Sequence, residues 1–248
     1  MTEATPTCWI CGDPATTGEH KTKRSDLRDV FGTPSQGTPL YLHDAARRNR
    51  RIGSLDAKVL KSPGRICAYC NNARTQPHDR AWEKLSTALR TRTPELQPES
   101  VVRTNRIFRC DTAREMLNVH LYFVKVFGCH IAGGDIPLDL SGFRNAILNG
   151  RANPHVYLKF GVGRTFAGQP MTGMSDMWLA PAPVGRSSSF ATWFYDIDGV
   201  GINVMFAADG EKRQGLIGAW HPRTGTTRLV IADYHEDAGA VESASSTA

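Results

Sequence analysis

The sequence predicts an α+β protein with two parts, a metal-stapled N-terminal part and a C-terminal part that contains an antiparallel sheet. Two observations lead to this prediction. Four of the six cysteines form two Cys-x-x-Cys pairs within the first 70 residues. Beyond about residue 103, apolar residues first recur with a helical period and then alternate, as they do in strands. We therefore expect domains at residues 1–100 and 103–235, followed by a disordered tail at 238–248.

The composition sets limits on the kind of protein. A chain of 248 residues, 40% of them hydrophobic, is long enough to bury substantial cores. No apolar run approaches the roughly 20 residues that span a bilayer. The first residues lack the basic and apolar segments of a secretory signal. We therefore expect a cytoplasmic protein with no membrane partner and with reduced cysteines rather than disulfides.

The net charge of +6 is unevenly distributed along the chain. Residues 1–110 contain 19 Lys and Arg against 11 Asp and Glu, whereas the remaining residues contain 11 against 13. The excess positive charge therefore lies in the half that carries the Cys-x-x-Cys pairs. Such a distribution favours a polyanionic partner, most simply nucleic acid, although a solvated basic surface is the alternative.

The N-terminal part is expected to hold turns, an insertion and one helix. Residues 1–20 are rich in turn-forming residues. Residues 21–61 contain basic residues and a Gly- and Pro-containing loop, and are expected to be an insertion. Residues 71–92 are predicted to be helical, with Pro77 in the first turn, where its missing N–H costs nothing. The apolar face of this helix would contain Trp82, Leu85, Ala88 and Leu89.

The C-terminal part is expected to begin with helices and continue with strands. Residues 112–127 are apolar on more than one side, which indicates a core helix. A second helix is expected at 141–148, with Ser141 as its N-cap and Gly150 as its C-terminal stop. Period-two patterns then predict strands at 155–160, 190–197, 202–206, 216–219 and 228–232.

The two cysteine pairs, Cys8 with Cys11 and Cys67 with Cys70, have the spacing of zinc knuckles. Each pair can offer two thiolates from one tight turn, and two such turns complete a tetrahedral site. Four thiolates leave no position for water, so the expected zinc is structural rather than catalytic.

The residues around the cysteine pairs carry a resemblance. Gly18-Glu19-His20 lies between the pairs, and Asn71-Asn72 follows the second pair directly. This order resembles the zinc-stapled branch of the HNH endonucleases over residues 8 to about 90. The resemblance implies a treble-clef-like ββα-metal core and metal-dependent hydrolysis of DNA phosphodiester bonds.

The resemblance also implies roles for individual residues. His20 would be the general base that accepts a proton from the attacking water. Glu19 and Asn71 would ligate a catalytic Mg²⁺ or Mn²⁺, which needs few protein ligands because it keeps several waters. The family's middle Asn would fall near Ser62, so Asn72 or a backbone carbonyl would have to orient His20 instead. His78 is a second candidate for the metal ligand that we assign to Asn71.

Several basic residues are candidates for contacts with the DNA backbone, which would bind without specifying sequence. They are Lys21, Lys23, Arg24, Arg48, Arg51 and Arg74. A non-catalytic zinc finger that binds nucleic acid or protein is the alternative function. The C-terminal part carries no motif that we can assign, and one expected role for it is homodimerisation.

Overall fold

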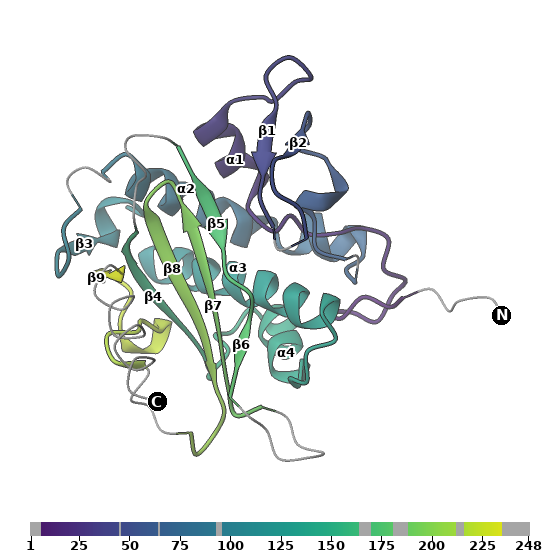
Figure 1. Ribbon diagram of the computed structural model, residues 1–248. Helices are drawn as coiled ribbons and strands as arrows, with labels where there is room; N and C mark the ends of the chain where they lie inside the picture. Colours follow the sequence, from purple (N-terminus) through teal and green to yellow (C-terminus); the bar gives the residue numbers. More distant parts are fainter. Residues whose placement is uncertain are drawn as a thin grey trace, which may run out of the picture.

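The computed structural model describes residues 6–44, 46–63, 65–92, 96–163, 170–180, 188–211 and 216–234 (Figure 1). The expected tail at 238–248 lies outside these residues. The described chain is a mixed α+β fold in which helices pack on one large sheet. None of its described helices is long and apolar enough to cross a bilayer.

Two extended segments lie antiparallel near the cysteine pairs. Isolated bridges join Thr17 to Ile66 and His20 to Lys61. Helix α2 (Gln76–Arg90) follows the second segment after a π-helical turn at Cys70–Arg74. The helix expected at 71–92 is thus interrupted. The proline in the first turn of α2 accounts for this, because it has no N–H to donate to the preceding turn.

The insertion at 21–61 is more ordered than the sequence indicated. It contains helix α1 (Arg24–Phe31) and a hairpin of β1 (Leu40–Leu42) with β2 (Arg50–Ile52). Asp26 of α1 is buried and accepts hydrogen bonds from Trp82 Nε1 and Ser86 Oγ of α2, both at 2.9 Å. One carboxylate therefore ties the insertion to α2.

The C-terminal helices lie close to the predicted positions. Helix α3 spans Thr112–Gly133. Helix α4 spans Ser141–Asn149 and ends at Gly150, whose left-handed conformation confirms the predicted stop. The predicted N-cap at Ser141 is wrong, because the side chain of Asp139 accepts from the Ser141 N–H instead, at 2.9 Å.

Among the described residues the sheet has seven strands, of which six follow the order β3-β9-β4-β8-β7-β5 while β6 pairs with β7. All the pairs are antiparallel except β4 with β9, which is parallel, so the sheet is mixed. The strands are β3 (Val101–Arg103), β4 (Val156–Val162), β5 (Thr172–Met174), β6 (Trp178–Leu179), β7 (Phe190–Ile197), β8 (Val200–Ala207) and β9 (Arg228–Asp233).

One predicted strand is wrong. Residues 216–219 form a turn in which Gly218 has a φ of 74°, and the following Trp220 makes an isolated bridge to Leu158. The short strands β3, β5 and β6 were not predicted, because two or three residues are too few to show a period.

A single hydrophobic core runs through both parts of the chain. Trp82 of α2 stacks on Tyr122 of α3 at 5.5 Å and meets Tyr195 of β7 edge-on at 6.0 Å. Trp9, between the first two cysteines, donates a hydrogen bond from Nε1 to the buried Cys129 Sγ of α3 at 3.3 Å. Independent folding of the two expected domains stays a prediction.

Candidate metal centre and catalytic residues

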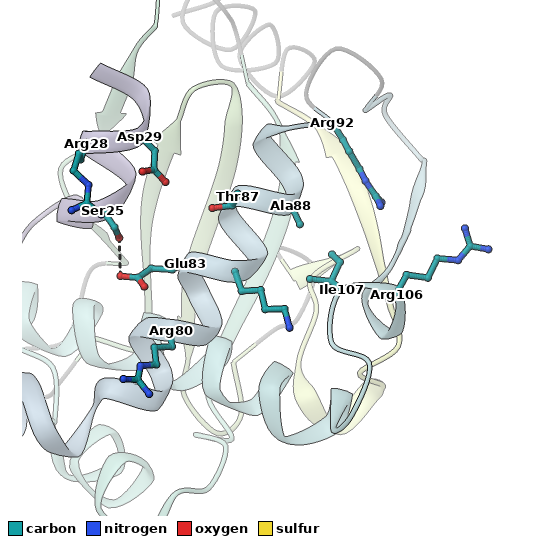
Figure 2. A pocket seen from close by; sticks show the side chains of 11 residues that line it. Ser25, Arg28, Asp29, Arg80, Glu83, Thr87, Ala88, Arg92, Arg106 and Ile107 are labelled. Atoms are coloured by element: carbon teal, nitrogen blue, oxygen red, sulfur yellow. Dashed lines mark hydrogen bonds between the residues drawn. The ribbon is translucent and has the colours of Figure 1, made fainter. Parts of the chain in front are cut away.

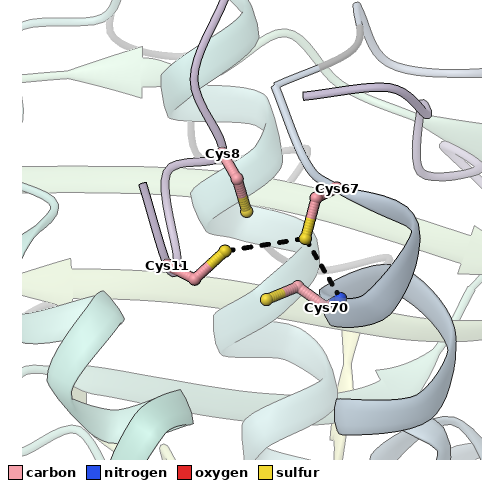
Figure 3. A group of neighbouring side chains, drawn as sticks. All are labelled: Cys8, Cys11, Cys67 and Cys70. Atoms are coloured by element: carbon pink, nitrogen blue, oxygen red, sulfur yellow. Dashed lines mark hydrogen bonds between the residues drawn. The ribbon is translucent and has the colours of Figure 1, made fainter. Parts of the chain in front are cut away.

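The four cysteines of the two pairs converge (Figure 3). Their Sγ atoms lie within 4.8 Å of one another, and those of Cys11 and Cys67 are 3.6 Å apart. An ion about 2.3 Å from each sulfur of a regular tetrahedron would separate the sulfurs by about 3.8 Å. The cluster therefore fits a tetrahedral metal such as zinc.

Two tight turns aim the thiols at this common point. In the first, the Gly12 N–H donates to Cys8 O at 2.8 Å, and Gly12 has a φ of 87° that favours glycine. In the second, the Asn71 N–H donates to Cys67 O at 2.9 Å. Burial raises the pKa of Cys11 to about 11, so a bound cation would be needed to hold it as a thiolate near pH 7.

Glu19 does not face an open site. Its side chain is buried and forms an ion pair with Lys125 of α3, with 3.1 Å between Oε1 and Nζ. Lys125 also pairs with Asp79 at 2.8 Å, and Asp79 pairs with Lys23 at 3.2 Å. Burial raises the pKa of Glu19 despite the attraction of Lys125. The carboxylate already has a cationic partner, so in this arrangement Glu19 does not fit a Mg²⁺ or Mn²⁺ site.

His20 makes a separate contact, with the insertion. Its Nε2 lies 3.1 Å from the carbonyl oxygen of Leu55. A carbonyl can only accept, so Nε2 carries the proton and the lone pair of the neutral ring lies on Nδ1. Burial lowers the pKa of His20, so the imidazole is neutral near pH 7. A backbone carbonyl thus orients the ring, which was one of the two substitutes expected for the missing middle Asn.

Asn71 is fixed beside the extended segment that carries His20. Its Nδ2 donates to Thr17 Oγ1 at 3.3 Å and to Gly18 O at 3.4 Å. Its Oδ1 is buried and has no hydrogen-bond partner among the described residues. An unpartnered amide oxygen is a suitable ligand for a hard cation.

The close approach of the two extended segments explains the glycine beside Glu19. A Cβ at position 18 would lie 2.6 Å from Ser62 O. Ser62, at the place expected for the middle Asn, donates its backbone N–H to Glu19 O at 2.8 Å. Its buried hydroxyl has no partner in the part of the chain that the structure describes, so Ser62 does not orient His20.

The remaining two candidates lie elsewhere. Asn72 donates from Nδ2 to the carbonyl of Ala68 at 2.9 Å, an exposed contact within its own turn. His78 is buried, and its Nδ1 lies 3.1 Å from Asn118 Oδ1 on α3. Burial lowers the pKa of His78. His78 is therefore engaged between α2 and α3.

The basic residues predicted to contact DNA differ in their surroundings. Lys23 is held by two carboxylates, and Arg24 pairs with Asp56 at 2.9 Å while both side chains stay more than half exposed. The guanidinium of Arg74 lies over the Tyr69 ring at 5.2 Å. Lys21 is half-buried, and Arg48 and Arg51 are exposed.

Sequence reasoning missed the buried charges around Glu19. Lys125 is fully buried and interrupts the apolar run at residues 121–127 of α3. A cation in the middle of an apolar helical segment is a signal that a buried acid must face it. The sequence does not say which of the many acids that is.

In comparisons with known proteins, no family model, curated protein or solved structure matches this chain.

Proposed function

We propose that this protein is a metal-dependent endonuclease that hydrolyses phosphodiester bonds of DNA, with His20 as its general base. The proposal combines the resemblance of the motif order with the geometry around His20. The protein would be stapled by a structural zinc on the four cysteines, and the excess positive charge of the N-terminal part would attract the substrate.

The observation that carries the proposal is the contact between His20 and the Leu55 carbonyl. This contact fixes the ring and leaves Nδ1 as the proton acceptor. The lowered pKa keeps the ring neutral, so it can accept a proton from water near pH 7.

Within this proposal the residues of the chain have distinct tasks. His20 takes a proton from the water that attacks phosphorus, and the Leu55 carbonyl holds the ring and stabilises its charge once the proton has moved. Asn71 Oδ1 would hold the divalent cation, whose chemistry is to neutralise charge on the scissile phosphate. Glu19 would be a ligand only if it exchanged Lys125 for the metal, and otherwise positions the segment that bears His20.

A plasmid-nicking assay with Mg²⁺ and with Mn²⁺ tests the proposal. We expect the wild type to nick supercoiled DNA and His20→Ala to nick at least about 100-fold more slowly, the usual contribution of a general base. His43→Ala is the matched control, because His43 is an exposed histidine of the same insertion. Zinc content and circular dichroism should be the same for all three proteins.

The pH dependence supplies a second readout of the same assay. The base must be neutral, so the nicking rate should rise with pH and level off once His20 is deprotonated. Because the pKa of His20 is lowered, the midpoint should lie below the ordinary imidazole value of about 6.5. Equal rates for His20→Ala and the wild type, or no nicking by the wild type with either metal, would contradict the proposal.

The second candidate function is a non-catalytic zinc module that binds nucleic acid. The ion pair between Glu19 and Lys125 favours this alternative, since it occupies the carboxylate expected at the metal. A wild type that binds DNA but never nicks it would identify the protein as this binding module.

A further inference from the structure

A groove of about 690 Å³ runs along α2 and is also lined by α1 and by the segment that precedes α3 (Figure 2). Helix α1 contributes Arg28 and Asp29, and α2 contributes Arg80 and Glu83, among others. Ile107 lines it from the segment before α3. We call this surface the α2 groove.

The α2 groove is rich in exposed positive charge. Two acids line it, Asp29 and Glu83. Five cations line it, and all five are exposed residues: Arg28, Arg80, Lys84, Arg92 and Arg106.

Both acids have cationic partners that do not line the groove, and each partner is shared with a second carboxylate, Lys23 with Asp79 and Arg90 with Asp26. Glu83 pairs with Lys23 at 3.4 Å and accepts a hydrogen bond from Ser25 Oγ at 2.8 Å. Asp29 pairs with Arg90 at 3.2 Å. By contrast, none of the five groove cations forms an ion pair with a carboxylate among the described residues. The five cations therefore outnumber the two acids of the groove and can pair with an external anion, and one of them, Lys84, also lies 5.3 Å from the centre of the Phe108 ring.

The arrangement of these charges suits a long anion rather than a compact one. Arg80 and Lys84 are four residues apart, so they share one face of α2. From Arg80 to the end of α2 at Arg90 the axis runs about 15 Å, which matches about four base-pair steps of 3.4 Å. The other three cations come from α1, from just beyond α2 and from the segment before α3, and Figure 2 shows the labelled arginines spread around the groove rather than converging on one point, as a site for a small phosphate would require.

We propose that the α2 groove binds the phosphate backbone of duplex DNA. This proposal rests on the proposed function for the identity of the polyanion. The groove also adjoins the candidate site, because Lys23, which pairs with the groove residue Glu83, is only three residues from His20. A backbone held in the groove would thus lead a strand toward the segment that carries the general base.

Binding of a fluorescein-labelled 30-base-pair duplex, followed by anisotropy without added divalent metal, tests this inference. If five phosphates are contacted, the wild-type affinity should fall about 500-fold between 50 and 200 mM salt. Arg80→Glu/Lys84→Glu should bind at least about tenfold more weakly at 50 mM salt, and the slope of log affinity against log salt should be smaller by about 2. Arg80→Ala/Lys84→Ala should show the same smaller slope with a milder loss.

The matched control is Arg144→Glu/Arg151→Glu, which makes the same charge change at two exposed arginines outside the groove. It should bind DNA nearly as the wild type does. Groove variants that bind as tightly as this control would overturn the proposal. A wild type that does not bind the duplex at 50 mM salt would also overturn it, even if that protein binds heparin, another polyanion. His20→Ala should bind normally. Groove-dependent binding by a wild type that never nicks DNA would refute the nuclease and leave this inference standing.

Discussion

Lys125 is the residue on which the buried charges of the N-terminal part converge. It is fully buried, and its Nζ lies within 3.1 Å of both Glu19 and Asp79. Burial alone would lower the pKa of Lys125, but the two carboxylates outweigh this effect and raise it. Because Glu19 precedes His20, this pairing also fixes the backbone at the candidate base.

Removal of this cation should therefore cost more than removal of either acid. We expect Lys125→Met to lower the free energy of unfolding by about 3–5 kcal/mol, because it leaves two buried carboxylates without this partner. Glu19→Gln should cost less, about 1–3 kcal/mol, because Lys125 keeps its bond to Asp79. Urea unfolding measures both, and equal losses for the two variants would show that the ion pair is not organised around Lys125.

The chemistry of individual residues was more predictable than their orientation. The cysteine spacing was enough to predict a four-thiol site, since each pair closes its own turn. Glu19 and His20 are neighbours on an extended segment, so their side chains leave it in different directions. Which of them faces the interior depends on Lys125, more than 100 residues away in the chain, and no local pattern contains that information.

At the scale of elements, packing of Trp9 against α3 joins the cysteine turns to the rest of the molecule. A Cβ on Gly128 of α3 would lie 2.6 Å from two ring atoms of Trp9. Gly142 of α4 is different, since its nearest neighbour would be Asn153 Nδ2 at an ordinary 3.6 Å. Only the first of these two helical glycines is required by its surroundings.

A pair of alanine substitutions separates the two cases. Gly128→Ala should destabilise the protein by about 1–3 kcal/mol, because the indole has to move within a packed core. Gly142→Ala should be neutral or stabilising by up to about 1 kcal/mol, through helix propensity alone. Thermal unfolding of both variants checks this, and the idea fails if Gly128→Ala is as stable as Gly142→Ala.

Elements with a long regular pattern were predictable, and short ones were not. Strand β7 occupies the predicted residues 190–197, because its inward side chains alternate over most of its eight positions. Helix α1 was missed because it is only eight residues long and buries only two of them, Asp26 and Leu27. Its position depends on hydrogen bonds from α2 to Asp26, which a sequence pattern does not reveal.

At the scale of the whole molecule, the cysteine cluster closes the chain around the insertion and packs on the shared core. Loss of the metal should thus weaken the entire fold rather than one loop. The reason is that metal binding to such a site contributes directly to folding free energy.

We expect purified protein to contain one zinc per chain. Cys67→Ser/Cys70→Ser should lose the zinc, and its Tm should fall by more than about 10 °C, the shift expected for a loss of several kcal/mol in a chain of this size. Cys110→Ser is the control, because Cys110 is exposed and outside the cluster. A zinc-free variant that melts at the wild-type temperature would show that the cluster does not support the fold.

The carboxylate of Asp26 limits how this chain can be shortened. Besides its bonds from Trp82 and Ser86, it accepts a third bond from α2, from Arg90 Nη2 at 3.3 Å, and one from Tyr195 OH of β7 at 3.4 Å. Deletion of the entire segment 21–61 would leave four donors without their shared acceptor. A trimmed variant would have to keep α1 and give up only the hairpin at 40–52, so the removable unit of this protein is smaller than its apparent insertion.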